Sequence, residues 1–304
     1  MKKILFAILF LSALSLSAQE DTTLVRPWAL NGFFSQQLNQ VSFTNWAAGG
    51  ENSFASTSIA VLTANYSKEK TTWENKLDLA YGLIKTQDTP TRKNEDKIDL
   101  LSKYGHKVSP KIAATALLNF RSQFTAGYNY PDDEEVVSNF LAPGYLLASL
   151  GFDYKPVDYL SIFFSPATGK FTFVNDETLS AIGAYGVEPG KTFRPEFGAM
   201  ASFTFAKDIF ENVNLASKLD LFNNYTDSNK PNRKNTDVNW QTNLNMKVNK
   251  FITASMGFNL IYDHDIPVPI FDTVGGEEVQ VGTGPRTQFK QIFGIGLSYN
   301  FKRE

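Results

Sequence analysis

The chain carries few side chains that could perform acid–base or nucleophilic chemistry. It has no cysteine and two histidines, so thiol chemistry and disulfides are excluded and imidazole chemistry has two possible centres. One of them, His264, lies between Asp263 and Asp265, and a histidine beside carboxylates could act as a general base or bind a metal. Adjacent residues of an extended chain point to opposite sides, so the triplet needs acids from a second segment. The stretch "PDDEEVV" at residues 131–137 is the one obvious source.

We expect these two acidic stretches to be solvated loops, which is the usual role of a charge run. One alternative is an enzyme site or a divalent-metal site formed by the two stretches together. Another is a set of carboxylates that binds calcium and crosslinks lipopolysaccharide. We predict no catalytic residue, no resident metal and no cofactor.

The glycine-rich stretch "SFTNWAAGGENS" at residues 42–53 could instead cradle a phosphate. A phosphate-binding loop has a lysine followed by serine or threonine and runs from a strand into a helix, and neither feature is found here. We interpret the stretch as a turn between two strands, whose glycines supply positive φ and close packing. Whether this loop constricts a pore is left open. The loop residues that we single out are Asn45, Trp46, Gly49, Gly50, Glu51 and Asn52.

The first residues have the order of a secretory signal peptide. Met-Lys-Lys is followed by an apolar run from Ile4 to Leu16 and by small residues, which predicts cleavage after about Ala18. Residues 1–18 are therefore expected to be a signal peptide and residues 19–27 a periplasmic segment. Beyond them the sequence shows no run of about 18 apolar residues, which argues against a transmembrane helix in the mature protein.

The composition narrows the class of protein further. Lys plus Arg number 29 against 31 for Asp plus Glu, so the chain lacks the basic excess of a nucleic-acid-binding protein. Phenylalanine and tyrosine are abundant, at 26 and 12 residues, which suits a protein that places aromatic rings at a membrane interface.

The elements that must position the candidate residues are β-strands. In "WENKLDLAYGLIK", residues 73–85, apolar and polar residues alternate, which indicates a long strand with one apolar face. The same alternation returns in "VNLASKLDLFNNY" and "DVNWQTNLNMKVN", at residues 213–225 and 237–249. The chain contains about twelve such segments: residues 28–40, 53–66, 72–85, 97–107, 112–128, 144–154, 159–165, 193–206, 213–225, 237–248, 251–263 and 287–301.

The lengths of these segments and their connectors favour a membrane barrel. Strands of soluble sandwiches average about five or six residues, whereas strands of about 9 to 11 residues cross a bilayer. Short and long connectors alternate and the count is even, as in outer-membrane barrels with short periplasmic turns and long extracellular loops. We therefore predict an all-β fold, a single antiparallel transmembrane β-barrel of about 12 strands over residues 28–304, in the outer membrane of a Gram-negative cell.

In that fold the apolar phase faces lipid. Aromatic residues near the segment ends, on or near this phase, are expected to form interfacial girdles: Trp73, Tyr81, Tyr104, Tyr128, Tyr154, Tyr262 and Tyr299. His106 shares the phase of Tyr104 and lies toward a short turn, so we interpret it as a structural or interfacial histidine at the periplasmic rim. That position argues against a barrel phospholipase, whose base must face the outer leaflet.

The polar phase faces the lumen, and its charged residues are our candidates for ion selectivity: Lys76, Asp78, Arg121, Arg194, Glu196, Lys218 and Asp220. Both signs are present, so the lumen could be a hydrated pore or a salt-bridged plug. Barrels of about eight strands are filled and those of 16 to 18 are open, so twelve strands leave both outcomes available. The long connector at residues 166–192 contains the apolar "LSAIGAYGV", and we expect it to fold inward as a plug.

Two motifs carry a resemblance. The stretch "SFTNWAAGGENS" resembles the hallmark of a family of Bacteroidota outer-membrane barrels that is catalogued only as a domain of unknown function. The stretch "DETLSAIGAYGVEPGKTFRPEFGA", residues 176–199, looks like the second signature of that family. The last segment, "QFKQIFGIGLSYNF", ends on Phe301 and looks like the C-terminal signal that barrel-assembly machinery reads. The resemblance implies a fold and an envelope location and brings no assigned activity.

The function that we expect is passive or substrate-specific passage of small solutes through the barrel. A structural barrel that docks another envelope protein is the main alternative, followed by an envelope enzyme and by lipid transport. The partners that follow from the location are outer-membrane lipid, lipopolysaccharide and the barrel-assembly machinery, and we expect no nucleic acid.

Overall fold

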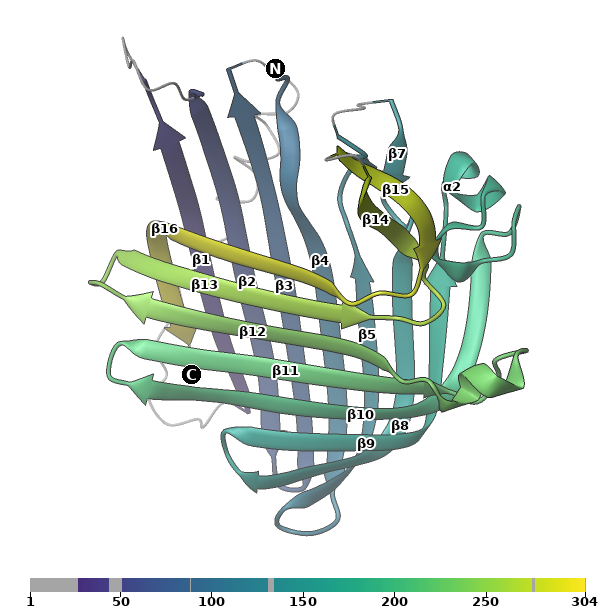
Figure 1. Cartoon of the computed structure of the whole chain (residues 1–304). Coiled ribbons are helices and arrows are strands. Elements are labelled where there is room, and N and C mark those ends of the chain that lie inside the picture. The colour runs from purple at the N-terminus through teal and green to yellow at the C-terminus, as the bar shows by residue number, and fades with distance from the viewer. Residues whose placement is uncertain (1–26, 44–50, 88, 131–133, 275–276, 304) are drawn as a thin grey trace.

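Twelve antiparallel strands close into a barrel in the computed structural model, which describes residues 27–43, 51–87, 89–130, 134–274 and 277–303 (Figure 1). Around the barrel the order of neighbours is β1, β16, β13, β12, β11, β10, β9, β8, β5, β4, β3 and β2. Their bounds are β1 Trp28–Val41, β2 Ser53–Lys68, β3 Thr71–Thr86, β4 Arg92–Lys107, β5 Ile112–Ser122, β8 Gly144–Val157, β9 Leu160–Phe173, β10 Phe193–Phe210, β11 Val213–Asn224, β12 Asp237–Lys247, β13 Ile252–Tyr262 and β16 Gln288–Arg303.

Smaller elements occupy the long connectors. Between β5 and β8 lies a short hairpin of β6 Gly127–Tyr128 and β7 Val136–Ser138, and between β13 and β16 lies a hairpin of β14 Val268–Val274 and β15 Glu277–Gly284. The helical turns are α2 Glu177–Ala181 and η1 Ala184–Gly186, both between β9 and β10, and η2 Lys230–Lys234 between β11 and β12. All of these lie at the end of the barrel opposite the short turns (Figure 1).

The predicted fold class is confirmed, because the twelve predicted segments correspond to the twelve barrel strands. The predicted signal peptide and the segment that follows it lie outside the described residues, apart from Pro27. Leu30 pairs with Arg303, so β1 begins and β16 ends at the same end of the barrel, the end with the short turns. The near and far walls cross in Figure 1, as expected for strands that tilt against the barrel axis.

The predicted bounds were wrong by four residues or more in four places. Two are simple extensions, since β4 begins at Arg92 instead of residue 97 and β10 ends at Phe210 instead of residue 206. The seventh strand continues from Leu160 to Phe173, well into the predicted loop, because its pairing with β8 and β10 shifts near Pro166 and then resumes. A β-bulge there accommodates the missing N–H of proline. The fifth strand ends at Ser122, and Tyr128 belongs to the small β6 instead of the aromatic girdle.

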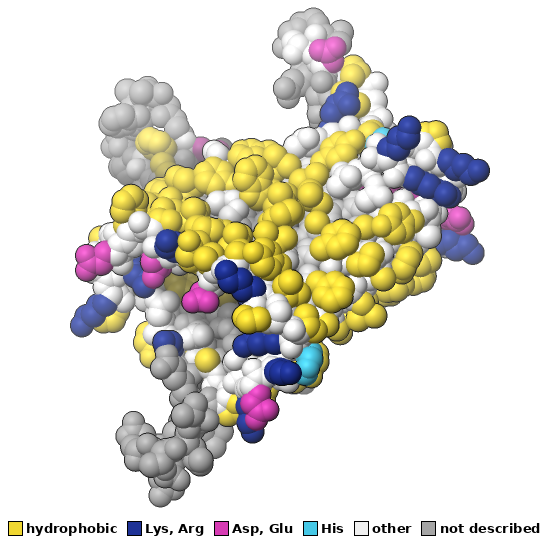
Figure 2. Space-filling view, turned by 90° about the horizontal axis from the view of Figure 1, so that it is seen from below, with side chains coloured by type: hydrophobic (Ala, Val, Ile, Leu, Met, Phe, Trp, Pro, Cys, Tyr) yellow, Lys and Arg dark blue, Asp and Glu magenta, His cyan; other side chains and the backbone are white. Residues whose placement is uncertain are grey.

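Side chains of the two strand phases differ sharply in exposure. Leu118 and Phe164 point outward and are 53% exposed, whereas their neighbours Leu117 and Phe163 point inward and are 3% and 1% exposed. Figure 2 shows apolar side chains gathered across the middle of one face and Lys and Arg toward its edges. An apolar belt of this extent is typical of a surface that contacts lipid.

Aromatic side chains mark the short-turn end of this belt. The ring centroids of Trp28 and Tyr66 are 5.3 Å apart, and those of Trp28 and Trp73 are 5.7 Å apart. The indole N–H of Trp73 donates to Ser102 Oγ at 2.8 Å, which satisfies the polar atom of an outward-facing ring. His106 lies on the outward phase with Tyr104 at this end, as predicted.

A matched pair of substitutions tests the two-phase arrangement. We expect Phe163→Ala to lower the free energy of unfolding by about 3–5 kcal/mol, because it leaves a cavity in the barrel interior. Phe164→Ala should lower the free energy of unfolding by only about 1.5–3 kcal/mol, the free energy of transferring the side chain out of water, because lipid or detergent chains fill the vacated space. The measurement is urea unfolding of both variants in lipid vesicles, followed by tryptophan fluorescence. Equal losses would contradict the assignment of the two faces.

Candidate functional site in the barrel lumen

The structure places all seven lumen candidates on the inward phase of their strands. They lie on β3, β5, β10 and β11: Lys76, Asp78, Arg121, Arg194, Glu196, Lys218 and Asp220. Every one of them takes part in an ion pair. Lys76 is the most exposed, with 46% of its side chain accessible, whereas the side chain of Glu196 is 2% exposed. Most of these charges are therefore held by the protein wall and only Lys76 is well placed to meet mobile ions.

The most buried of these interactions centre on Lys170 of β9. Its Nζ lies 2.7 Å from Asp237, 2.8 Å from Asp263 and 3.6 Å from Glu196. Asp237 begins β12 and Asp263 directly follows β13, so one ammonium group joins strands that are not neighbours around the barrel. Three carboxylates around a nearly buried amine compensate the loss of its hydration. Sequence reasoning missed Lys170 because it fell within the predicted loop.

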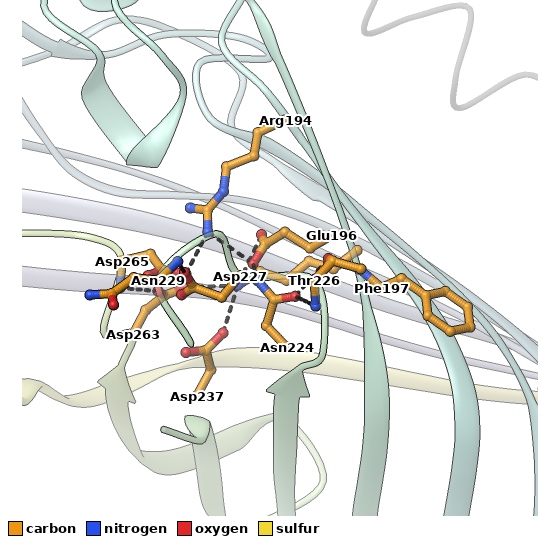
Figure 3. Close-up of polar contacts among 11 residues, drawn as sticks. Arg194, Glu196, Phe197, Asn224, Thr226, Asp227, Asn229, Asp237, Asp263 and Asp265 are labelled. Carbon is orange, nitrogen blue, oxygen red and sulfur yellow. Dashed lines mark hydrogen bonds and ion pairs between the residues drawn. The ribbon is translucent and has the colours of Figure 1, made fainter. Parts of the chain in front are cut away.

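Arg194 extends this group toward the end with the long loops (Figure 3). Its guanidinium lies 3.1 Å from Glu196 and forms a second ion pair with Asp265. The side-chain N–H of Asn224 donates to Glu196 at 3.0 Å. We call these six charged residues the Lys170 cluster: Lys170, Arg194, Glu196, Asp237, Asp263 and Asp265. Four carboxylates and two cations give the cluster a formal excess of negative charge.

The acids of the Asp-His-Asp triplet thus face the lumen cations. Asp263 and Asp265 pair with Lys170 and Arg194, while His264 Nδ1 lies 3.3 Å from the hydroxyl of Tyr262. The alternative in which these acids orient the histidine therefore has no geometric support. Three residues of "PDDEEVV", 131–133, lie outside the described residues. Within the described ranges, no three acidic or histidine side chains are arranged to hold a metal ion.

A second group of ion pairs lies nearer the short turns. Lys103 of β4 lies 3.2 Å from Glu74 and 3.0 Å from Asp153, and Lys155 also pairs with Glu74. These contacts join β3, β4 and β8 across the inner surface. They hold a wall of the lumen in place at the end opposite the Lys170 cluster.

Apolar side chains fill the space between the two groups. An inward-facing cluster comprises Leu117, Leu147, Phe163, Met200 and Phe222, one residue from each of five consecutive strands from β5 to β11. Lys170 Nζ lies 5.3 Å from the ring centre of Phe222, which links this core to the Lys170 cluster. The wall from β5 to β11 is therefore a packed interior, and we call it the packed wall.

The remaining sector of the lumen wall is different in kind. The inward positions of β1, β2 and β13 carry no charge along the strands as described, and those in the middle of β16 are also neutral. We call these residues the uncharged sector: Asn31, Phe33, Ser35, Gln37, Asn39, Ala55, Thr57, Ile59, Val61, Thr63, Asn65, Thr253, Ser255, Gly257, Asn259, Ile261, Ile292, Gly294, Gly296 and Ser298. Amides, hydroxyls and glycines are common in it.

Two further contacts reach across the lumen to β4. Lys97 of β4 donates to Gln241 Oε1 of β12 at 3.4 Å, although these strands lie on opposite sides of the barrel. Lys290 of β16 pairs with Glu95 of β4 at 2.8 Å, again between strands that are not adjacent. The lumen is therefore bridged by side chains at this level.

A cap covers the packed wall at the long-loop end. Ala142, Val174, Leu179 and Val187 form an apolar cluster that joins the β5–β8 and β9–β10 connectors. The apolar "LSAIGAYGV" gains cover from a neighbouring loop at the mouth, beyond the ends of β9 and β10 (Figure 1). Gly186 of the same stretch lies against Arg194 and the backbone of Asp265, so the segment also reaches the Lys170 cluster. The hydroxyl of Tyr185 donates to the carbonyl of Val137. Burial raises the pKa of Tyr185 to about 12, so this hydroxyl keeps its proton at neutral pH.

Of the predicted loop motif, Asn45, Trp46, Gly49 and Gly50 lie outside the described residues. Asn52 is described, and its side chain joins two connectors. Its Oδ1 accepts the N–H of Phe43 at 2.6 Å, and its Nδ2 donates to Gln87 at 2.9 Å. Asn52 thus links the β1–β2 connector to the β3–β4 connector, and Glu51 precedes it.

Comparison with known proteins adds a family match and a set of structural likenesses. Residues 38–128 match the model of a family described as "Protein of unknown function (DUF3078)". This match covers less than half of the chain. No curated protein matches the sequence. In the described segments, no helix combines the length and the apolar character needed to cross a membrane.

Several solved barrels align with the chain at low identity. An outer membrane channel from Pseudomonas putida F1 has 10% identity and a TM-score of 0.40, with 94% of this chain and 100% of that one covered. The translocator domain of the autotransporter NalP from Neisseria meningitidis has 10% identity and a TM-score of 0.35, covering 99% and 96%. The toluene transporter TodX from P. putida has 9% identity and a TM-score of 0.27, covering 91% and 90%.

Removing the central amine should expose how strongly the Lys170 cluster depends on it. We expect Lys170→Gln to lower the free energy of unfolding by about 3–5 kcal/mol, because Asp237, Asp263 and Glu196 are left facing one another without their cation. Protonation of these carboxylates at lower pH removes their repulsion. The difference in unfolding free energy between variant and parent should therefore become smaller as the pH is lowered. Urea unfolding at several pH values measures both effects.

The matched control is Lys191→Gln, which removes one positive charge from an exposed position in the neighbouring connector. It should change stability by less than about 0.5 kcal/mol. A loss for Lys170→Gln no larger than that of the control would show that the cluster contributes nothing to stability.

Proposed function

We propose that this protein is an outer-membrane barrel that lets small solutes pass along the uncharged sector of its lumen. The observation that carries the proposal is the asymmetry of the wall. The side from β5 to β11 is packed with apolar groups and ion pairs. The inward positions of β13, β1, β2 and the middle of β16 instead carry amides, hydroxyls, glycines and a few apolar side chains, and none of them is charged. A neutral polar surface binds solutes weakly enough to release them, which conduction requires.

The bridges across the lumen make the passage a narrow one. The Lys290–Glu95 ion pair and the Lys97–Gln241 hydrogen bond both cross the space that a solute would use. We infer that the resting protein conducts ions poorly and that these contacts open transiently. Among the seven charged candidates, Lys76 is the one whose exposure lets it bias the sign of the ions that pass.

The proposal includes the location and partners expected from the sequence. We propose that outer-membrane lipid and lipopolysaccharide surround the barrel, and the apolar outer surface supports contact with lipid. We also propose that the barrel-assembly machinery inserts it. A Bacteroidota source remains an inference from the two sequence motifs.

Single-channel conductance in planar bilayers tests the passage. Lys290→Gln and Glu95→Gln each remove one partner of the bridging ion pair, so we expect more frequent or larger open steps than in the parent protein. Lys85→Gln is the matched control, because Lys85 lies on the outward phase of β3 at the same end and carries the same charge. If both variants conduct no more than the Lys85→Gln control, the Lys290–Glu95 ion pair does not restrict the passage.

A second candidate function is a barrel that docks another envelope protein. It is favoured by apolar side chains that the cap exposes beyond the strands: Ile182 is 71% exposed and Phe140 is 48% exposed. Such residues in water are typical of protein contact sites. If the parent, Lys290→Gln and Glu95→Gln are all folded in bilayers and none of them conducts ions, this candidate is favoured over a channel.

A further inference from the structure

Strands β1 and β16 pair along only part of their length. Their ladder runs from Leu30 and Arg303 to Gln37 and Gly296 and then stops. Residues 38–41 of β1 continue to pair with β2, and residues 288–295 of β16 continue to pair with β13. Between the two segments, both of which are fully described, no ladder pair is formed. We call this part of the wall the open seam.

The open seam lies within the apolar belt. Its outward side chains include Leu38, Phe289, Phe293 and Ile295, which are 54–62% exposed. Side chains of this kind belong in hydrocarbon, where an unpaired backbone N–H or C=O costs several kcal/mol. A barrel normally avoids such edges by closing its sheet. An interruption of the ladder at this depth therefore has an energetic cost, which points to a functional role.

Glycines in β16 shape the foot of the open seam. A Cβ atom at Gly296 would lie 2.5 Å from the carbonyl oxygen of Gln36, so only glycine permits this approach of β16 to β1. A Cβ atom at Gly294 would lie 2.2 Å from Gln37 Oε1, which shows that the Gln37 side chain rests against this glycine. Figure 1 shows β16 leaving β13 on the near wall and turning toward β1.

Behind the seam, the lumen wall carries an apolar strip. Phe33 pairs with Val61, and Ile59 follows on the same inward phase of β2, opposite Ser35. The next inward pair, Gln37 and Thr57, is level with the last pair of the β1–β16 ladder. The strip therefore leads directly to the foot of the open seam.

At its other end, the strip meets a cavity. The cavity has a volume of about 310 Å³ and is lined by Phe33, Val61 and Thr63 together with Lys247 and Lys302. That volume is within the range of small-molecule sites. Its lining combines the apolar side chains of Phe33 and Val61 with the ammonium group of Lys247, which suits an amphiphile that carries one anionic group.

We propose that an anionic amphiphile of small size binds in this cavity and passes along the strip and through the open seam between the lumen and the outer membrane. A polar solute has no need of an opening into lipid, whereas an apolar tail does. This inference rests on the proposed function, because it requires that the lumen admit solutes, and it specifies their class and their route.

Binding is tested with 11-(dansylamino)undecanoic acid, whose fluorescence rises in an apolar site, on the whole protein in lipid nanodiscs. Lys247→Gln should weaken binding about tenfold, as expected for loss of a charge-assisted contact. The methyl ester of the probe should bind both proteins equally. Lys250→Gln, in the turn after β12, is the control. Equal binding of the acid by the parent and Lys247→Gln would overturn the cavity assignment.

The route is tested by closing the seam with a disulfide, which is simple in a chain without cysteine. Leu38→Cys with Ile295→Cys occupies the first positions beyond the paired ladder, and Gln36→Cys with Leu297→Cys occupies an outward pair already within it. The quantity measured is the rate at which bound probe reaches a fluorescent acceptor in the bilayer. Oxidation of the first pair should reduce that rate to the protein-free background, and reduction should restore it.

Oxidation of the control pair should leave the transfer rate unchanged. If the first pair does not oxidise, a short bis-methanethiosulfonate linker joins the same cysteines. Transfer that continues through a joined seam would overturn the lateral route. Conductance of the same oxidised protein in the Lys290→Gln background, where the bridging ion pair is removed, separates the two proposals. Conductance without seam-dependent transfer rejects this inference alone, whereas absence of both rejects the proposed function as well.

Discussion

The satisfaction of backbone hydrogen bonds without water is the constraint on which this structure depends. A strand in hydrocarbon must find both of its neighbours, and β2 and β3 pair with each other over their whole length, from Ser53 with Thr86 to Lys68 with Thr71. Closure into a ring of twelve strands supplies the second neighbour for each strand. The same requirement makes the early end of the β1–β16 ladder, at Gln37 and Gly296, the most informative irregularity in the barrel.

Closure also forces one phase of every strand into the lumen, and the protein uses this phase in two ways. On the packed wall, Lys170 and Arg194 face four carboxylates and Phe222 packs among apolar neighbours. Ion pairs of this kind compensate their own desolvation and also fix which strands face one another, since a displaced partner leaves a charge uncompensated. In the uncharged sector, neutral side chains form hydrogen bonds between neighbouring strands, such as the 3.3 Å hydrogen bond from Asn31 of β1 to Thr63 of β2.

The sequence predicted the fold well because lipid enforces a strict period of two. Strands such as residues 213–225 repeat it without a break, and their bounds were nearly correct. The bulge near Pro166 interrupts that period, so Lys170 was assigned to a loop and the centre of the main cluster was missed. The sequence also could not reveal which inward residues meet, because the contact of Lys97 with Gln241 depends on the stagger of the whole barrel. The open seam left no signal for a similar reason: Gly294 and Gly296 fit a continuous strand as well as a bend.

The two walls differ in how freely they can move. Displacement of β9 or β10 would separate Lys170 and Arg194 from acids on several other strands, so the packed wall resists deformation. Strands β1 and β2 are held on their inner side by neutral contacts, and β1 lacks a neighbour beyond Gln37 on one side. Any enlargement of the lumen should therefore occur by movement of β16, β1 and β2. The ion pair of Lys290 with Glu95 connects β16 to β4, so its separation would add to the cost of such a movement.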